Sequence, residues 1–271
     1  MTLLPKTFAI SLAIAVAAAA NTFGHDTWLN PERFTLRKNA SAVLALTSGM
    51  KFPKNETAIK PDRIEAARCR LASETGDISK IRAGKESLRF TRPLKADGVA
   101  VCWVQLHPRT LELKPEQVSE YLDEIGATED LRKEWAAMTP PRWRESYRKN
   151  SKTILRVGLA ESDVSWKEPV GMPLEIVPER DPTLARVHAT EMFSVRVLKN
   201  GEPLADFPLN AVRGGESKGE TRKTDSAGRV SFLLDKPGRW LLRGTEVRRS
   251  SEADVDWESD FTTLTLEVAA K

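Results

Sequence analysis

One histidine of this chain, His25, lies where it could become the first residue of the mature protein and bind a metal ion. His25 is followed directly by Asp26, and the whole chain has three histidines. A histidine at the first position of a mature chain offers two nitrogen donors, its α-amine and its imidazole. Nitrogen donors in a planar set suit Cu(II) or Ni(II). Asp26 would add an oxygen donor or orient the imidazole, so the sequence predicts a metal-binding start to the mature chain.

The residues before this histidine have the pattern of an export signal. Lys6 gives a charged start, and the apolar run 8–20 is too short for a stable membrane-spanning helix. Signal peptidase needs small residues at the last and third-last positions that it removes. Two pairs meet this need: Thr22 with Gly24, and Ala18 with Ala20. We expect a signal peptide over 1–24 and a periplasmic or secreted protein; a cut after Ala20 would instead leave His25 inside a short leader.

The two other histidines are the available nitrogen partners for such a site. His107 comes after an apolar run and before Pro108, and His188 precedes the last part of the chain. Neither has a neighbour at ligand spacing, so the site would have to be assembled in space. The predicted metal ligands are therefore His25, Asp26, His107 and His188. The alternative is an ordinary polar start, with Trp28 packing in the core.

The two cysteines, Cys69 and Cys102, point to one disulfide, because an exported protein matures under oxidising conditions. Two buried free thiols in neighbouring strands are the alternative. A cysteine metal site is not favoured, since no Cys-x-x-Cys or Cys/His cluster accompanies them.

Composition excludes several classes of protein. Hydrophobic residues make up 40% and charged residues 30% of the 271 residues, with a net charge of +4. These values fit a globular protein without nucleic-acid partners. A second long apolar run does not follow the signal, so we expect no membrane span after it. Catalytic motifs such as a Gly-x-Ser-x-Gly elbow or a phosphate-binding glycine loop are missing from the sequence, so we expect no enzyme. The acidic segment 254–260 lacks the spacing of a calcium loop and is predicted to be a solvated loop.

The hydrophobic pattern predicts a mainly β protein with two β-sandwich (Ig-like or prealbumin-like) domains. Strands are expected over 42–46, 98–106, 153–158, 174–178, 193–198, 207–212, 230–234, 239–243 and 261–268. A short helical insertion lies between them. Its first helix runs from Pro115 to Gly126, its second begins after the N-cap Thr128, and a third is predicted over 142–149 with Trp143 and Tyr147 inward.

These elements predict five segments along the chain. They are a signal peptide (1–24), an N-terminal β-sandwich (25–110), a helical insertion (111–150), strands and a linker (151–182), and a C-terminal prealbumin-like β-sandwich (183–271).

Several motifs together resemble a known bacterial family. These motifs are His25-Asp26-Thr27-Trp28-Leu29, the segments 111–114 and 120–122, Trp166 to Pro169, 171–178, 201–204, 224–229, 237–242 and 263–266. They resemble exported proteins that share a domain of unknown function, often named as nickel- or cobalt-uptake accessory proteins. The resemblance implies two β-sandwich parts, the second similar to the prealbumin-like modules beside carboxypeptidases. Many relatives carry a histidine in the stretch where this chain has Gly244-Thr245-Glu246-Val247. The chain departs from the family pattern here, which argues against a histidine-rich metal site.

The resemblance implies a role in metal handling. We expect a periplasmic protein that binds or delivers Ni²⁺, Co²⁺ or Cu²⁺ for uptake, with metal-uptake transporter components as partners. The alternative is a non-enzymatic module that binds a protein or a glycan without metal, because such modules carry their sites on loops that a sequence does not reveal.

Overall fold

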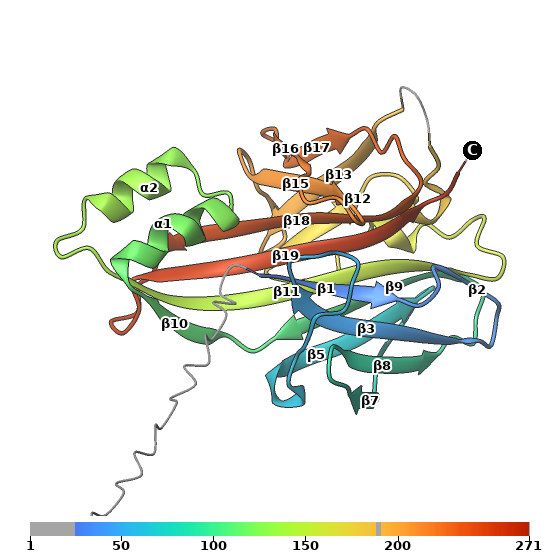
Figure 1. Ribbon diagram of the computed structural model, residues 1–271. Coiled ribbons are helices and arrows are strands. Elements are labelled where there is room, and N and C mark those ends of the chain that lie inside the picture. The colour runs from blue at the N-terminus through green and yellow to red at the C-terminus, as the bar shows by residue number, and fades with distance from the viewer. Residues whose placement is uncertain (1–24, 188–190, 271) are drawn as a thin grey trace, which may run out of the picture.

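The computed structural model describes residues 25–187 and 191–270, which form a mainly β protein with several sheets, as predicted (Figure 1). The predicted signal peptide 1–24 and His188 lie outside the described residues. No described helix is long and apolar enough to cross a membrane.

The first sheet is five-stranded and carries the start of the described chain. Its strands follow the order β1-β3-β8-β7, with β4 paired to β3, and all pairs are antiparallel. The bounds are β1 (Asp26–Pro31), β3 (Ser41–Gly49), β4 (Thr57–Ala58), β7 (Lys80–Ala83) and β8 (Leu88–Pro93).

The second sheet has ten strands and runs through the whole molecule. Its path is β16-β15-β18-β19-β11-β9-β5-β6, with β2 and β10 also paired to β11. The bounds are β2 (Thr35–Leu36), β5 (Ile64–Leu71), β6 (Glu74–Asp77), β9 (Gly98–Leu106), β10 (Arg109–Leu113), β11 (Trp143–Val157), β15 (Pro208–Arg213), β16 (Glu220–Lys223), β18 (Gly238–Arg249) and β19 (Trp257–Val268). The long strands β18, β19 and β11 lie side by side at its centre (Figure 1).

The third sheet covers the C-terminal half of the second. It contains β12 (Leu174–Pro178), β13 (Phe193–Lys199), β14 (Glu202–Pro203) and β17 (Arg229–Phe232). An apolar core between these two sheets includes Val197, Phe232 and Leu266. A second core, between the five-stranded sheet and β5, β9 and β11, includes Phe90 and Leu155.

The predicted disulfide is confirmed. Cys69 and Cys102 are bonded and fully buried within this second core. They are direct neighbours in the register of β5 and β9. The bridge therefore joins two adjacent strands of the ten-stranded sheet.

Two helices cover one end of the central strands. Helix α1 (Pro115–Glu124) begins at the predicted proline, and Gly126 follows it with a positive φ of 64°. Helix α2 (Glu129–Ala136) is capped by the Thr128 hydroxyl, which accepts from the N–H of Leu131 at 3.3 Å. Short 3-10 turns are η1 (Pro61–Arg63), η2 (Ser165–Lys167) and η3 (Pro182–Leu184).

The predicted third helix over 142–149 is wrong. These residues form the first half of β11, which pairs with β10 on one side and in parallel with β19 on the other. Trp143 and Tyr147 are spaced for one helical face, but they also fit alternation along a strand. Pairing with β19, more than a hundred residues later in the chain, decides between the two periods.

Strand β11 also lies across the predicted segment borders. It starts inside the predicted insertion 111–150, ends in the predicted segment 151–182, and pairs with β19 of the predicted last domain. The two halves thus share one sheet, and the division into five segments stays a prediction.

Candidate functional site

The first described residues are held on the central strands by side-chain donors. The backbone carbonyl of Thr27 accepts from the hydroxyl of Ser151 at 2.8 Å and from that of Thr263 at 2.7 Å. All three residues are buried. The strands β11 and β19 therefore fix the position of β1 through polar contacts as well as through packing.

Residues 25 and 26 are fixed by two cations. Lys149 Nζ donates to the carbonyl oxygen of His25 at 2.6 Å, and the Arg243 guanidinium pairs with the Asp26 carboxylate. With Ser151 and Thr263, these groups form what we call the N-terminal seat. His25 itself is half-buried, so its imidazole remains within reach of solvent.

Lys149 is a buried cation within this seat. Its ammonium lies 5.5 Å from the ring centre of Tyr147 and 5.0 Å from that of Phe261. Burial lowers the pKa of Lys149 to about 8, against the opposing effect of the Asp26 charge. Burial, and next the Lys149 charge, also lower the pKa of His25. The imidazole of His25 is therefore neutral near pH 7, the form that ligates a metal ion.

A small hollow of about 180 Å³ lies beside the seat. Asp26, Asp123, Glu124, Asn210 and Arg243 line it, together with the turn after α1. Asp123 is paired with Arg132 at 2.8 Å. The hollow thus combines carboxylates with the guanidinium that already holds Asp26.

The structure does not gather the predicted ligands into a multi-residue metal site. No group of three or more His, Cys, Asp or Glu side chains placed to hold a metal occurs among residues 25–187 and 191–270. Asp26 is engaged by Arg243, and His107 is exposed just after β9. The backbone of His107 contacts Arg63, whose Nη2 donates to its carbonyl at 3.0 Å. His188 lies outside the described residues.

The central strands present opposite chemistry on their two faces. Side chains alternate along β11, so Trp143, Glu145, Tyr147 and Lys149 lie on the face toward the helices and the seat. We call this the helix face. Ser146, Arg148, Asn150 and Lys152 lie on the reverse face.

The helix face buries one carboxyl group among neutral donors. Glu145 is fully buried and accepts from Tyr121 Oη at 2.8 Å and from Trp143 Nε1 at 2.6 Å. The hydroxyl of Ser259 is a third donor. Burial raises the pKa of Glu145 although these hydrogen bonds oppose the shift. The stacked rings of Trp143 and Trp257, 4.8 Å apart, close the site from solvent.

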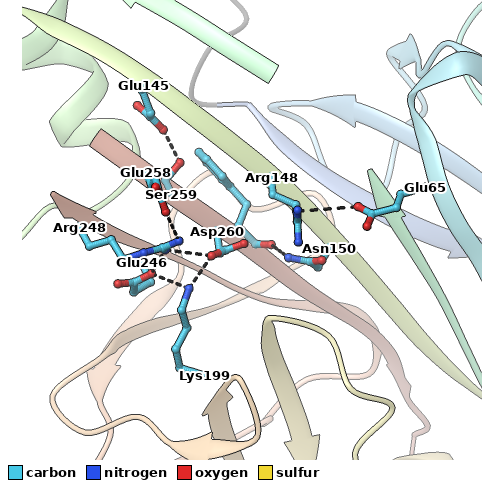
Figure 2. Close-up of polar contacts among 11 residues, drawn as sticks. Glu65, Glu145, Arg148, Asn150, Lys199, Glu246, Arg248, Glu258, Ser259 and Asp260 are labelled. Carbon is cyan, nitrogen blue, oxygen red and sulfur yellow. Dashed lines mark hydrogen bonds and ion pairs between the residues drawn. The ribbon is translucent and has the colours of Figure 1, made fainter. Parts of the chain in front are cut away.

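The reverse face carries a closed network of ion pairs (Figure 2). Glu246 accepts from Lys199 and from Arg248, each at 2.9 Å. Asp260, which is directly opposite Glu246 in the register, pairs with the same two cations. Two adjacent carboxylates are therefore neutralised by two shared cations.

Of the acidic residues predicted as a solvated loop, Asp254 is exposed in a turn, but the prediction is wrong for Asp256, Glu258 and Asp260, which belong to the reverse face. Asp256 and Asp260 are buried, and β19 begins at Trp257. Asp256 accepts from Arg142 at 2.9 Å and from Arg144 at 3.1 Å. Its pKa is lowered by these arginines against the effect of burial. The alternation of charge along 256–260 was the signal that these residues form a strand.

The reverse face also forms a hollow of about 310 Å³, lined by Ser146, Arg148, Lys199, Arg248 and Asp260 among others. Arg148 points away from the network toward Glu65, at 3.8 Å (Figure 2). Farther along β11, the ammonium of Lys152 and the carboxylate of Glu175 are fully buried together at 2.7 Å. Glu175 also accepts from the N–H groups of residues 170–172. Its position shows that the reverse face anchors the third sheet.

Sequence reasoning missed the residues that build the N-terminal seat. Lys149 was missed because 142–149 was predicted to be helical, and Ser151 was missed because it lies between that helix and the strand predicted over 153–158. Arg243 and Thr263 lie more than two hundred residues after the groups that they hold, Asp26 and Thr27. Alternation along β11 is the only sequence signal that places Lys149 and Ser151 on one face.

Comparisons with known proteins identify a family profile and several distant structural likenesses. The profile described as "Domain of unknown function (DUF4198)" matches residues 22–245. No curated protein sequence matches the chain. The D0-D1 domain of intimin shares 13% identity, with 89% of this chain and 97% of that chain covered and a TM-score of 0.23. The Yersinia pseudotuberculosis adhesin InvE shares 12% identity, with 88% and 58% covered and a TM-score of 0.24. The Clostridium thermocellum CbhA fibronectin(III)-like modules share 5%, with 89% and 95% covered and a TM-score of 0.20.

Proposed function

The chain belongs to a family whose domain has no known function (DUF4198), and we propose that this member is an exported, non-enzymatic protein that binds a divalent transition metal as cargo. The N-terminal seat is the observation that carries this proposal. Lys149, Arg243, Ser151 and Thr263 hold the backbone of residues 25–27 and the Asp26 side chain. Such a seat fixes one residue, His25, at the edge of the sheet.

A chelate at His25 needs few other groups. Processing before residue 25 would free the α-amine next to the imidazole, and both nitrogens belong to the residue that the seat holds. Pre-ordering of this residue lowers the entropy cost of chelation. Donors of this kind favour Cu²⁺ and Ni²⁺, with Co²⁺ weaker. Delivery of the metal to an uptake transporter is the role that the family resemblance suggests.

The proposal is tested by calorimetric titration of Ni²⁺ and of Cu²⁺ into two proteins. One begins at His25, and the other carries one additional glycine before it. The added residue separates the α-amine from the imidazole chelate, so we expect at least a tenfold loss of affinity, equal to about 1.4 kcal/mol. His25→Ala in the first protein should show the same loss.

Affinity for the protein that begins at His25 should also fall as the pH drops below about 7, because protons compete for the amine and the imidazole. Equal affinity of the two proteins would overturn the terminal chelate. Absence of binding by both would favour a module that binds a protein or glycan without metal.

A further inference from the structure

The net positive charge of the chain is concentrated in one hairpin. Residues 80–95 contain six Lys or Arg and one acidic residue, a net charge of +5, whereas the whole chain has +4. These residues form β7, β8 and their flanking turns at the edge of the five-stranded sheet. We call them the basic hairpin.

The register of the basic hairpin places three of its cations, Lys80, Arg82 and Arg89, on one side, whereas Arg92 lies on the other face and donates to the carbonyl of Asp77. Ile81 and Ala83 pair with Phe90 and Leu88, which are fully buried in the core. Lys80, Arg82 and Arg89 therefore lie on the outer face, because side chains alternate along a strand. Lys85 lies in the exposed turn that joins the strands.

Two of these cations face each other directly. Arg82 and Arg89 are opposite in the register of β7 and β8, and like charges in such a pair are destabilising. Arg89 has an ion pair with Glu32. Within the described part of the chain, Lys80, Arg82 and Lys85 have no ion pair. The opposed pair Glu246 and Asp260 differs, since two cations neutralise it.

Protection of a sheet edge explains only part of this pattern. Charged side chains on a short edge strand prevent pairing with other chains, which accounts for Lys80 and Arg82 on β7. Arg89 is on β8, which lies inside the sheet between β3 and β7. Lys85 and Lys95 are outside the strands. The hairpin thus carries more positive charge than edge protection requires.

We propose that the outer face of the basic hairpin docks on a membrane surface rich in anionic phospholipids. Its cations extend over a sheet edge and a turn, and phosphate headgroups offer a matching plane of negative charge. An acidic protein strand is disfavoured as the occupant, because β7 offers only four residues for pairing.

The test is sedimentation with vesicles of phosphatidylglycerol and phosphatidylethanolamine, compared with phosphatidylcholine alone. The protein runs from residue 25 to 271, which contains every described element. The variant is Lys80→Gln/Arg82→Gln/Lys85→Gln. The matched control, Lys167→Gln/Lys218→Gln/Lys223→Gln, removes three exposed charges elsewhere. All six side chains are exposed, so neither set of changes is expected to lower the thermal unfolding temperature.

We expect the unmodified protein and the control to bind anionic vesicles, and binding to disappear at about 1 M salt, where the Debye length is about 3 Å. At about 1 kcal/mol for each Lys or Arg near an anionic surface, the hairpin variant should partition roughly a hundredfold less. Equal loss in variant and control, or equal binding to phosphatidylcholine, would overturn the proposal. So would binding of the hairpin to soluble polyglutamate but not to vesicles, which would favour an acidic protein partner.

Discussion

The helix face and the reverse face of β18, β19 and β11 accommodate buried carboxyl groups with different partners. Both faces bury carboxyl groups. On the helix face Glu145 is surrounded by neutral donors, and burial raises its pKa. On the reverse face Asp256 and Glu175 lie beside cations, and their pKa values are lowered. The comparison teaches that the partners of a buried carboxyl, more than its depth, set its charge state.

The largest expected effect is on the reverse face, at the fully buried pair of Lys152 and Glu175. Lys152→Met should lower the free energy of unfolding by about 3–5 kcal/mol, because it leaves an unpaired buried carboxylate. Urea unfolding followed by tryptophan fluorescence measures the loss. The double variant Lys152→Met/Glu175→Gln keeps an acceptor for the N–H groups of residues 170–172 but removes the charge. It should therefore recover part of the free energy of unfolding that the single variant loses. A loss below about 1 kcal/mol in the single variant would contradict the role of the pair.

On the helix face, Glu145→Gln should cost about 1–3 kcal/mol, because an amide nitrogen replaces an acceptor of Trp143, Tyr121 or Ser259. The cost should depend on pH. The folded-state pKa of Glu145 is raised, so its stabilising contribution is complete below the ordinary value of 4.5 and falls as pH rises through the folded pKa. The difference between wild type and Glu145→Gln should therefore be larger at pH 4 than at pH 8. Urea unfolding at both values tests this, and a gap that widens with pH would show that Glu145 is ionised more readily than proposed.

The smallest effect is expected at the exposed rim of the reverse face. Glu258 pairs with Arg248 at 2.5 Å, but the two side chains are 27% and 40% exposed. Glu258→Gln should change the free energy of unfolding by less than about 1 kcal/mol, since solvent and salt screen such pairs. The same unfolding assay at low and high salt is the measurement. A cost as large as that of Lys152→Met would erase the distinction between the rim and the buried pair.

Local patterns were enough to predict much of the fold. The apolar run 98–106 is β9, and the proline, glycine and threonine signals around 115–128 mark α1 and the start of α2. The segment 142–149 was not predictable in this way, because its residues satisfy both a helical and a strand period. Its partner in the sheet, β19, lies at the far end of the sequence.

In the candidate site, too, some residues could be predicted from the local sequence and others only from the folded sheet. His25 and Asp26 were predicted from the chain itself, and they lie together on the described structure. The side chains that hold them come from β11, β18 and β19, so only the folded sheet reveals them. Metal binding at His25 remains a prediction, because it depends on a chain end that processing must create.

The position of β19 has a consequence for how the protein is made. The strand that joins β18 to β11 at the centre of the ten-stranded sheet is the last strand of the chain. During synthesis, neither the N-terminal seat nor the network around Asp260 can be completed before residues 257–268 leave the ribosome. The ten-stranded sheet is therefore completed only when translation ends, which fits the export that we propose, because a chain crosses a membrane before its sheet has formed.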